Sequence, residues 1–156
     1  MTSPLANLEN TIQSKPPYVA VNLENTIKFL NYSILPNFIS EKLNIPYEEA
    51  TLITPSLTVS TAFSEAYTFL GWIGIIALFI YWILMVFVYI IVMPKSSAYF
   101  ITGISVLNTI TVLNFFDNMM VFSPLSFQLI YPILFMLIFE KDIISYYYKK
   151  FKRKLG

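Results

Sequence analysis

The hydrophobic positions of this chain are concentrated in its second half, where they form three long stretches without charge. Residues 67–93 provide 27 uncharged positions, residues 98–116 provide 19, and residues 119–139 provide 21. A hydrocarbon core of about 30 Å is crossed by about 20 helical residues. The pattern therefore predicts three transmembrane helices, over about 67–93, 98–116 and 119–139.

The first 65 residues carry shorter helical patterns. Ser3-Pro4 is typical of a helix start, with Ser3 as the cap and Pro4 at the first helical position, and this helix should end before Lys15. A second helix is predicted from about Asn22 to about Leu35. Its apolar residues recur at helical spacing and share one face. They are Leu23, Ile27, Leu30 and Ile34.

The apolar face of this second helix has two interpretations. It either lies on the membrane surface or packs against other helices within an extramembrane loop. Packing within the loop is the more common outcome for such a face.

The second and third stretches contain features that are unusual for a lipid-facing helix. The second carries several Ser, Thr and Asn residues, ending with Asn114. Amides are costly against lipid, so these side chains should either bond neighbouring helices or line a substrate path. In the third stretch, Ser123-Pro124 resembles a helix start, which predicts non-helical backbone over residues 117–122.

The orientation follows from the positions of the cations. Six of the ten Lys and Arg residues lie in the tail 141–154, and Lys95 lies between the first two stretches. The loop between the second and third stretches holds Asp117 and no cation. Cytoplasmic flanks are enriched in Lys and Arg. The bias predicts that the tail is cytoplasmic and that residues 1–65 lie on the outer face.

Together these patterns predict an all-α, polytopic helical membrane protein. It has an outer segment of short amphipathic helices over 1–65, three transmembrane helices within 66–139, and a basic cytoplasmic tail over 140–156.

Composition removes several kinds of chemistry. Charged residues make up 12% of the chain, about half the share typical of soluble proteins. The chain has no cysteine and no histidine, which excludes disulfides, thiolate and imidazole catalysis, and metal sites built from these residues. No cofactor, no bound metal and no nucleic-acid partner are expected.

No complete catalytic signature occurs in the sequence, so candidate catalytic groups come from position alone. Glu65 precedes the first stretch and Asp117 lies in the outer loop, which predicts that both carboxylates lie at one membrane boundary. Either carboxylate would act as a general base or orient a hydroxyl group. The alternative is that both are solvated boundary charges.

Four segments together resemble the C-terminal part of an O-antigen polymerase, the oligosaccharide repeat-unit polymerase of the Wzy type. One is the Ser-Pro-x-x-Asn segment that ends at Asn7. The second and third are residues 54–63 and the aromatic-plus-Gly-x-x-Gly segment 65–74, which includes Tyr67. The fourth is residues 115–118, followed by a last apolar stretch and a basic tail.

The resemblance implies a glycosyltransferase of the bacterial inner membrane that takes part in lipopolysaccharide biosynthesis. Such an enzyme joins repeat units carried on undecaprenyl pyrophosphate at the periplasmic face. The implied partners are this lipid-linked glycan, membrane lipid, upstream transmembrane helices of the same polymerase, and a chain-length regulator. The candidate substrate-binding residues are Asn7, Tyr67 and Asn114.

The resemblance also implies that important parts of the site lie elsewhere. Members of the family are thought to use arginines in outer loops, whereas the single Arg of this chain is Arg153 in the tail. The sequence is therefore expected to belong to a longer chain and to be inactive alone. Alternative interpretations are a non-enzymatic helical membrane subunit, or part of a lipid-linked sugar flippase or acyltransferase.

The cation bias generates a topology prediction. A C-terminal reporter that works only in the cytoplasm should be active when fused after residue 156, and one that works only in the periplasm should be silent. Paired fusions in the same strain provide the measurement. The reverse pattern would invert the orientation.

Overall fold

A computed structural model describes residues 4–15, 19, 21–46 and 61–140 of the chain. Every regular element in these ranges is helical, which confirms the all-α prediction. In chain order the elements are α1 (Pro4–Ser14), α2 (Leu23–Phe29), the π-helix η1 (Leu30–Ile34), α3 (Asn37–Ser40), the 3₁₀ helix η2 (Glu41–Leu43), α4 (Ala62–Val92), α5 (Phe100–Leu113), α6 (Ser123–Ser126), the 3₁₀ helix η3 (Phe127–Leu129) and α7 (Ile130–Phe139).

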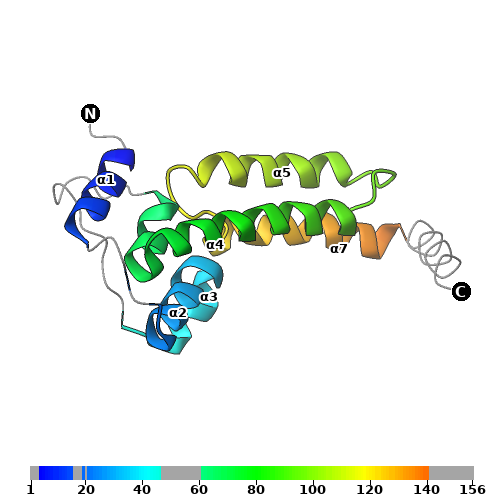
Figure 1. Cartoon of the computed structure of the whole chain (residues 1–156). Coiled ribbons are helices and arrows are strands. Elements are labelled where there is room, and N and C mark those ends of the chain that lie inside the picture. Colours follow the sequence, from blue (N-terminus) through cyan, green and yellow to red (C-terminus); the bar gives the residue numbers. More distant parts are fainter. Residues whose placement is uncertain (1–3, 16–18, 20, 47–60, 141–156) are drawn as a thin grey trace, which may run out of the picture.

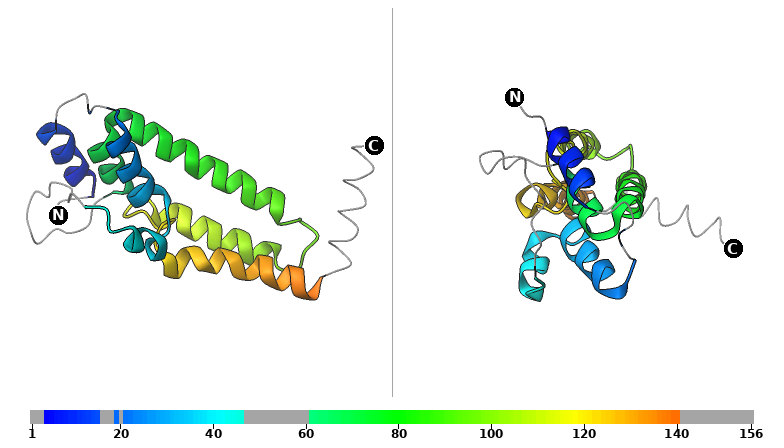
Figure 2. Two further views of the ribbon diagram at one scale, coloured as in Figure 1. Left: turned by 90° about the horizontal axis from the view of Figure 1, so that it is seen from below. Right: turned by 60° about the vertical axis from the view of Figure 1, so that its left-hand side comes forward.

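The elements form a long bundle with a smaller helical group at one end. Helices α4, α5 and α7 run side by side along the molecule (Figure 1). The short helices α1, α2 and α3 gather at one end of this bundle (Figures 1 and 2). After the orientation predicted from the sequence, this end is named the outer end, and the opposite end, near Lys95 and Glu140, is named the inner end.

The helices of the outer segment begin where the sequence predicts. Pro4 opens α1, which ends at Ser14. Asn22 caps α2, and its side-chain oxygen accepts a 2.7 Å hydrogen bond from the Asn25 backbone N–H. The second helix continues as the π-helix η1, and the Leu35 N–H donates to the Leu30 carbonyl at 2.9 Å.

Helix α4 is the one helix in the described ranges that is long and apolar enough to cross a membrane. Only 11% of the residues in the most apolar 18-residue stretch of α4 are buried. The core helix of a water-soluble protein would be mostly buried, so this exposed apolar surface favours a membrane setting.

Gly71 divides α4 into two helical pieces. Its φ of 60° and ψ of −142° are a conformation that only glycine adopts readily. The ring centroids of Phe63 and Trp82 lie 5.1 Å apart, whereas 19 positions along a straight helix extend about 28 Å. The first piece, Ala62–Leu70, therefore folds back along the second.

The fold-back requires close approach of the two pieces at Gly74. A Cβ atom added at Gly74 would lie 2.1 Å from the carbonyl oxygen of Ala66. The predicted stretch 67–93 is thus split. Residues 72–92 remain as a continuous apolar helix about 31 Å long, which matches the thickness of a hydrocarbon core.

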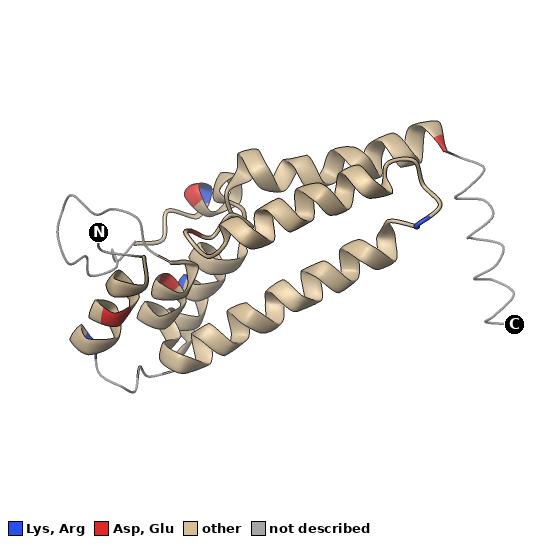
Figure 3. Ribbon diagram, turned by 90° about the horizontal axis from the view of Figure 1, so that it is seen from above, with Lys and Arg blue, Asp and Glu red and all other residues tan. Residues whose placement is uncertain are grey.

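The other two apolar helices are shorter than their predicted stretches. Helix α5 has 14 residues, and the run from α6 through α7 extends from Ser123 to Phe139. As predicted, Ser123-Pro124 starts a helix and the backbone of residues 117–122 is not helical. Charged residues lie towards the two ends of the bundle, and the helices between them are uncharged (Figure 3).

The contact at Gly74 generates a stability prediction. Gly74→Ala should lower the free energy of unfolding by about 1–3 kcal/mol, because its methyl group meets backbone that cannot rotate away. Unfolding in mixed detergent micelles measures the change. Ile76→Ala, at a side chain that is 59% exposed, is the control. Equal stability of the two variants would contradict the fold-back.

Candidate functional site

A polar pocket of about 320 Å³ lies near the outer end of the bundle. Its walls come from η1, α3, η2, the first piece of α4 and the loop that follows α5. The lining residues are Tyr32, Asn37, Ser40, Glu41, Glu65, Asp117, Asn118, Val121 and Phe122. The two carboxylates predicted to share a boundary, Glu65 and Asp117, therefore line the same pocket.

Each acidic side chain reaches the pocket through a different local feature. Glu65 lies in the first piece of α4, so the fold-back at Gly71 carries it down beside the long helix. Asp117 lies three residues after the C-cap of α5, and one of its carboxylate oxygens accepts a 2.7 Å hydrogen bond from the Asn118 N–H. Glu41 is the first residue of η2.

Three hydrogen bonds join the walls of the pocket across long sequence separations. The Asn37 N–H donates to the Val121 carbonyl at 2.9 Å, and the Phe38 N–H donates to the Ser123 hydroxyl at 3.3 Å. The Asn118 amide donates to the Ser33 carbonyl at 2.9 Å, with Asn118 only 2% exposed. These bonds fix α3 and η1 against the loop that bears Asp117.

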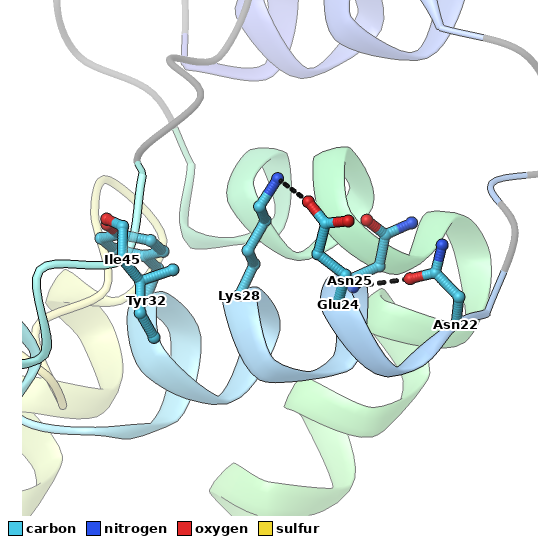
Figure 4. A network of polar contacts seen from close by, with 6 residues as sticks. All are labelled: Asn22, Glu24, Asn25, Lys28, Tyr32 and Ile45. Atoms are coloured by element: carbon cyan, nitrogen blue, oxygen red, sulfur yellow. Dashed lines mark hydrogen bonds and ion pairs between the residues drawn. The ribbon is translucent and has the colours of Figure 1, made fainter.

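The charge of the pocket is negative. Three of the lining residues are acidic, and none of the described lining residues is Lys or Arg. Lys28 is buried outside the lining, where its ammonium group pairs with Glu24 at 2.9 Å (Figure 4).

In the described ranges no group of three or more His, Cys, Asp or Glu side chains is arranged to hold a metal ion. The pocket suits hydrogen-bond donors or cations better than it suits an anion.

An apolar groove of about 350 Å³ lies on the other side of the same wall. Residues alternate between the two spaces: Pro36 and Phe38 line the groove, and Asn37 between them lines the pocket. In the loop, Met120 lines the groove and Val121 lines the pocket. The groove runs between α4 and the α6–α7 run and is lined almost entirely by apolar side chains.

The three predicted substrate-binding residues lie elsewhere. Asn7 is 2% exposed within α1, and its carbonyl accepts a 2.8 Å bond from the Thr11 hydroxyl. Tyr67 is 1% exposed, with its ring edge-to-face against Trp72 at 5.7 Å. The Asn114 side chain is buried and accepts a 3.2 Å bond from the Met120 N–H. None of the three lines the pocket, and the Asn114 side chain bonds the loop that follows α5.

Glu41 is the acidic pocket residue that sequence reasoning missed. It lies 76 positions before Asp117, between Pro36 and Pro46, in a stretch whose pattern gives no indication of a site. The bond between α3 and the loop at Val121 helps to bring it to the pocket.

No family model, no curated protein and no solved structure matches this chain. The resemblance stated above therefore depends on the quoted sequence segments alone.

The shared pocket predicts that Glu65 and Asp117 can be joined chemically. The chain has no cysteine, so Glu65→Cys with Asp117→Cys provides one unique thiol pair. A short flexible bis-maleimide should cross-link this pair in membranes, which a shift in gel mobility after proteolysis between the sites would report. The pair Asp117→Cys with Glu140→Cys, at opposite ends of the bundle, should stay unlinked. Equal linking of both pairs, or of neither, would contradict the shared pocket.

Proposed function

We propose that this chain is part of an O-antigen polymerase of the bacterial inner membrane, and that its polar pocket holds the acceptor end of a glycan. The observation that carries the proposal is the convergence of Glu41, Glu65 and Asp117 in one pocket near the outer end of the bundle. The quoted segments supply the reaction class.

In the proposed topology α4, α5 and the α6–α7 run are the three crossings, with the C-terminus in the cytoplasm. The apolar exposure of α4 supports its crossing. The long Lys- and Arg-rich tail supports the orientation.

The pocket carboxylates suit work on a sugar hydroxyl. A carboxylate orients the acceptor O–H and takes its proton as the oxygen attacks the anomeric carbon. A new bond forms between the acceptor oxygen and that carbon, and the bond from the carbon to the pyrophosphate oxygen breaks. Undecaprenyl pyrophosphate leaves with the electron pair. The adjacent apolar groove has the lining expected for a hydrocarbon chain.

The pyrophosphate itself calls for cations that the pocket does not present. Arg or Lys groups stabilise charge on a leaving phosphate. Of the cations described in the outer segment, Lys28 is buried and paired with Glu24, and Lys15 and Lys42 do not line the pocket. In the proposal these cations come from upstream helices or loops of the polymerase, and this chain contributes the acceptor side.

The absence of Lys and Arg from the described pocket lining also favours a second candidate function, that of a non-enzymatic membrane subunit. In that case the carboxylates would serve packing or solvation, and their replacement would leave glycan synthesis unchanged.

The proposal predicts a loss of polymerisation in cells that carry the complete gene. Glu65→Gln or Asp117→Asn should reduce long-chain glycan about 10²–10⁴-fold if the changed carboxylate is the base. Glycan length distribution on gels, at equal protein abundance, provides the measurement. Glu9→Gln, at an exposed residue of α1 outside the pocket, should behave as wild type. Unchanged glycan in both pocket variants would favour the non-enzymatic subunit.

A further inference from the structure

The second helix of the outer segment, α2 with η1, exposes a stripe of apolar residues and buries polar ones. Leu23, Ile27 and Leu30 are 77%, 43% and 46% exposed, whereas Phe29 on another side of the helix is buried. Lys28 and Asn31 are buried, at 8% and 1%. An amphipathic helix in water turns its apolar stripe to the protein core. The exposed stripe therefore indicates that this side of the helix meets an apolar environment.

Polar groups accumulate on the inner face of the same helix. Asn31 and Ser33 are buried, and within the described ranges neither the Asn31 amide atoms nor the Ser33 hydroxyl has a hydrogen-bond partner. Polar side chains at membrane depth face protein or a wet cavity and avoid lipid. Their inward direction supports lipid on the opposite face.

Contacts with α4 place this segment at membrane depth. Ile34 and Phe29 pack in one apolar cluster with Leu78 of α4, and the Tyr81 hydroxyl donates to the Ile34 carbonyl at 3.5 Å. Tyr81 lies nine positions after Trp72, or about 14 Å along the helix. The end of η1 therefore lies beside the middle of residues 72–92.

The only charged pair on α2 fits this setting. The buried stem of Lys28 directs its ammonium group to Glu24, one turn nearer the start of α2 (Figure 4). Cations at membrane depth extend towards the interface in the same way. Glu24 is largely exposed, with its side chain at 74%.

Exposed apolar residues also occur on α4 and α3. On α4, Ile73 and Ile76 are 57% and 59% exposed, and α2 packs directly against another side of α4. On α3, Phe38 is 42% exposed and stacks on Phe127 at 5.2 Å. Exposed apolar residues on elements that pack beside a membrane-crossing helix have the same surroundings as that helix, namely the acyl chains of lipid.

We propose that residues 27–38 form a re-entrant element in the outer half of the bilayer, with Ile27 and Leu30 against lipid acyl chains. The exposed charged residues Glu24, Glu41 and Lys42 lie outside this range, on either side of it, where the chain returns towards the interface. This element extends the bundle where α5 and the α6–α7 run are shorter than the second piece of α4. Short helices of this kind at membrane depth are stable where their polar backbone and side chains face protein or a cavity. The inference rests on the proposed crossing of α4, and it does not depend on the proposed polymerase activity.

The test uses single cysteines in the otherwise cysteine-free chain, labelled with an environment-sensitive fluorophore and reconstituted in phosphatidylcholine–phosphatidylglycerol vesicles. Leu30→Cys and Ile27→Cys report on the proposed lipid face. Ile76→Cys reports on the crossing of α4, and Gln13→Cys, exposed on α1, serves as the aqueous reference. Quenching by acyl-chain-brominated lipid is compared with quenching by iodide in water.

The ratio of lipid to iodide quenching at residues 27 and 30 should match that at residue 76 and exceed that at residue 13 several-fold. Iodide quenching at 27 and 30 as strong as at 13, with lipid quenching retained at 76, would overturn the re-entrant element alone. Protection of 27 and 30 from both quenchers would also overturn it, because protein would then cover the face. Loss of lipid quenching at 76 would overturn the crossing and the inference together.

Discussion

The turn at Gly71 is the constraint on which the other described features depend. A positive φ reverses the direction of α4, and the missing side chain at Gly74 lets the Ala66 carbonyl lie against the second piece. The first piece is then held by ring contacts such as Phe63 on Trp82, at 5.1 Å. Without this turn, Ala62–Leu70 would extend α4 outward as a straight helix and would contact none of its present neighbours.

The fold-back creates both the polar pocket and the apolar cluster beside it. It places Glu65 in one pocket with Asp117, and one turn further along the same piece it provides Phe69 to stack on Tyr32 at 5.7 Å. Helix α2 and η1 pack against this doubled part of α4, where Lys28, Asn31 and Ser33 are buried while Leu23, Ile27 and Leu30 stay exposed. Three of the few carboxylates in the described part of the chain thereby line one pocket.

The local features of this fold could be predicted from the sequence, because each depends on neighbouring residues. The starts of α1, α2 and α6 follow from Pro4, Asn22 and Ser123-Pro124. The fold-back could not be predicted, because residues 66–74 are uncharged throughout and Gly-x-x-Gly is equally typical of helix packing in lipid. The sequence predicts that the Glu65 and Asp117 carboxylates lie at the same membrane boundary. The structure brings them together beside the span, with a third acid, Glu41, whose position depends on contacts far apart in the chain.

The distance between residues 63 and 82 tests this account most directly. Spin labels at Phe63→Cys and Trp82→Cys, measured by pulsed electron resonance in reconstituted bilayers, should lie within about 15 Å because the native rings are in contact. A straight α4 would separate the two positions by about 28 Å. A single distribution at the longer distance would contradict the fold-back, the shared pocket and the packing of α2 together.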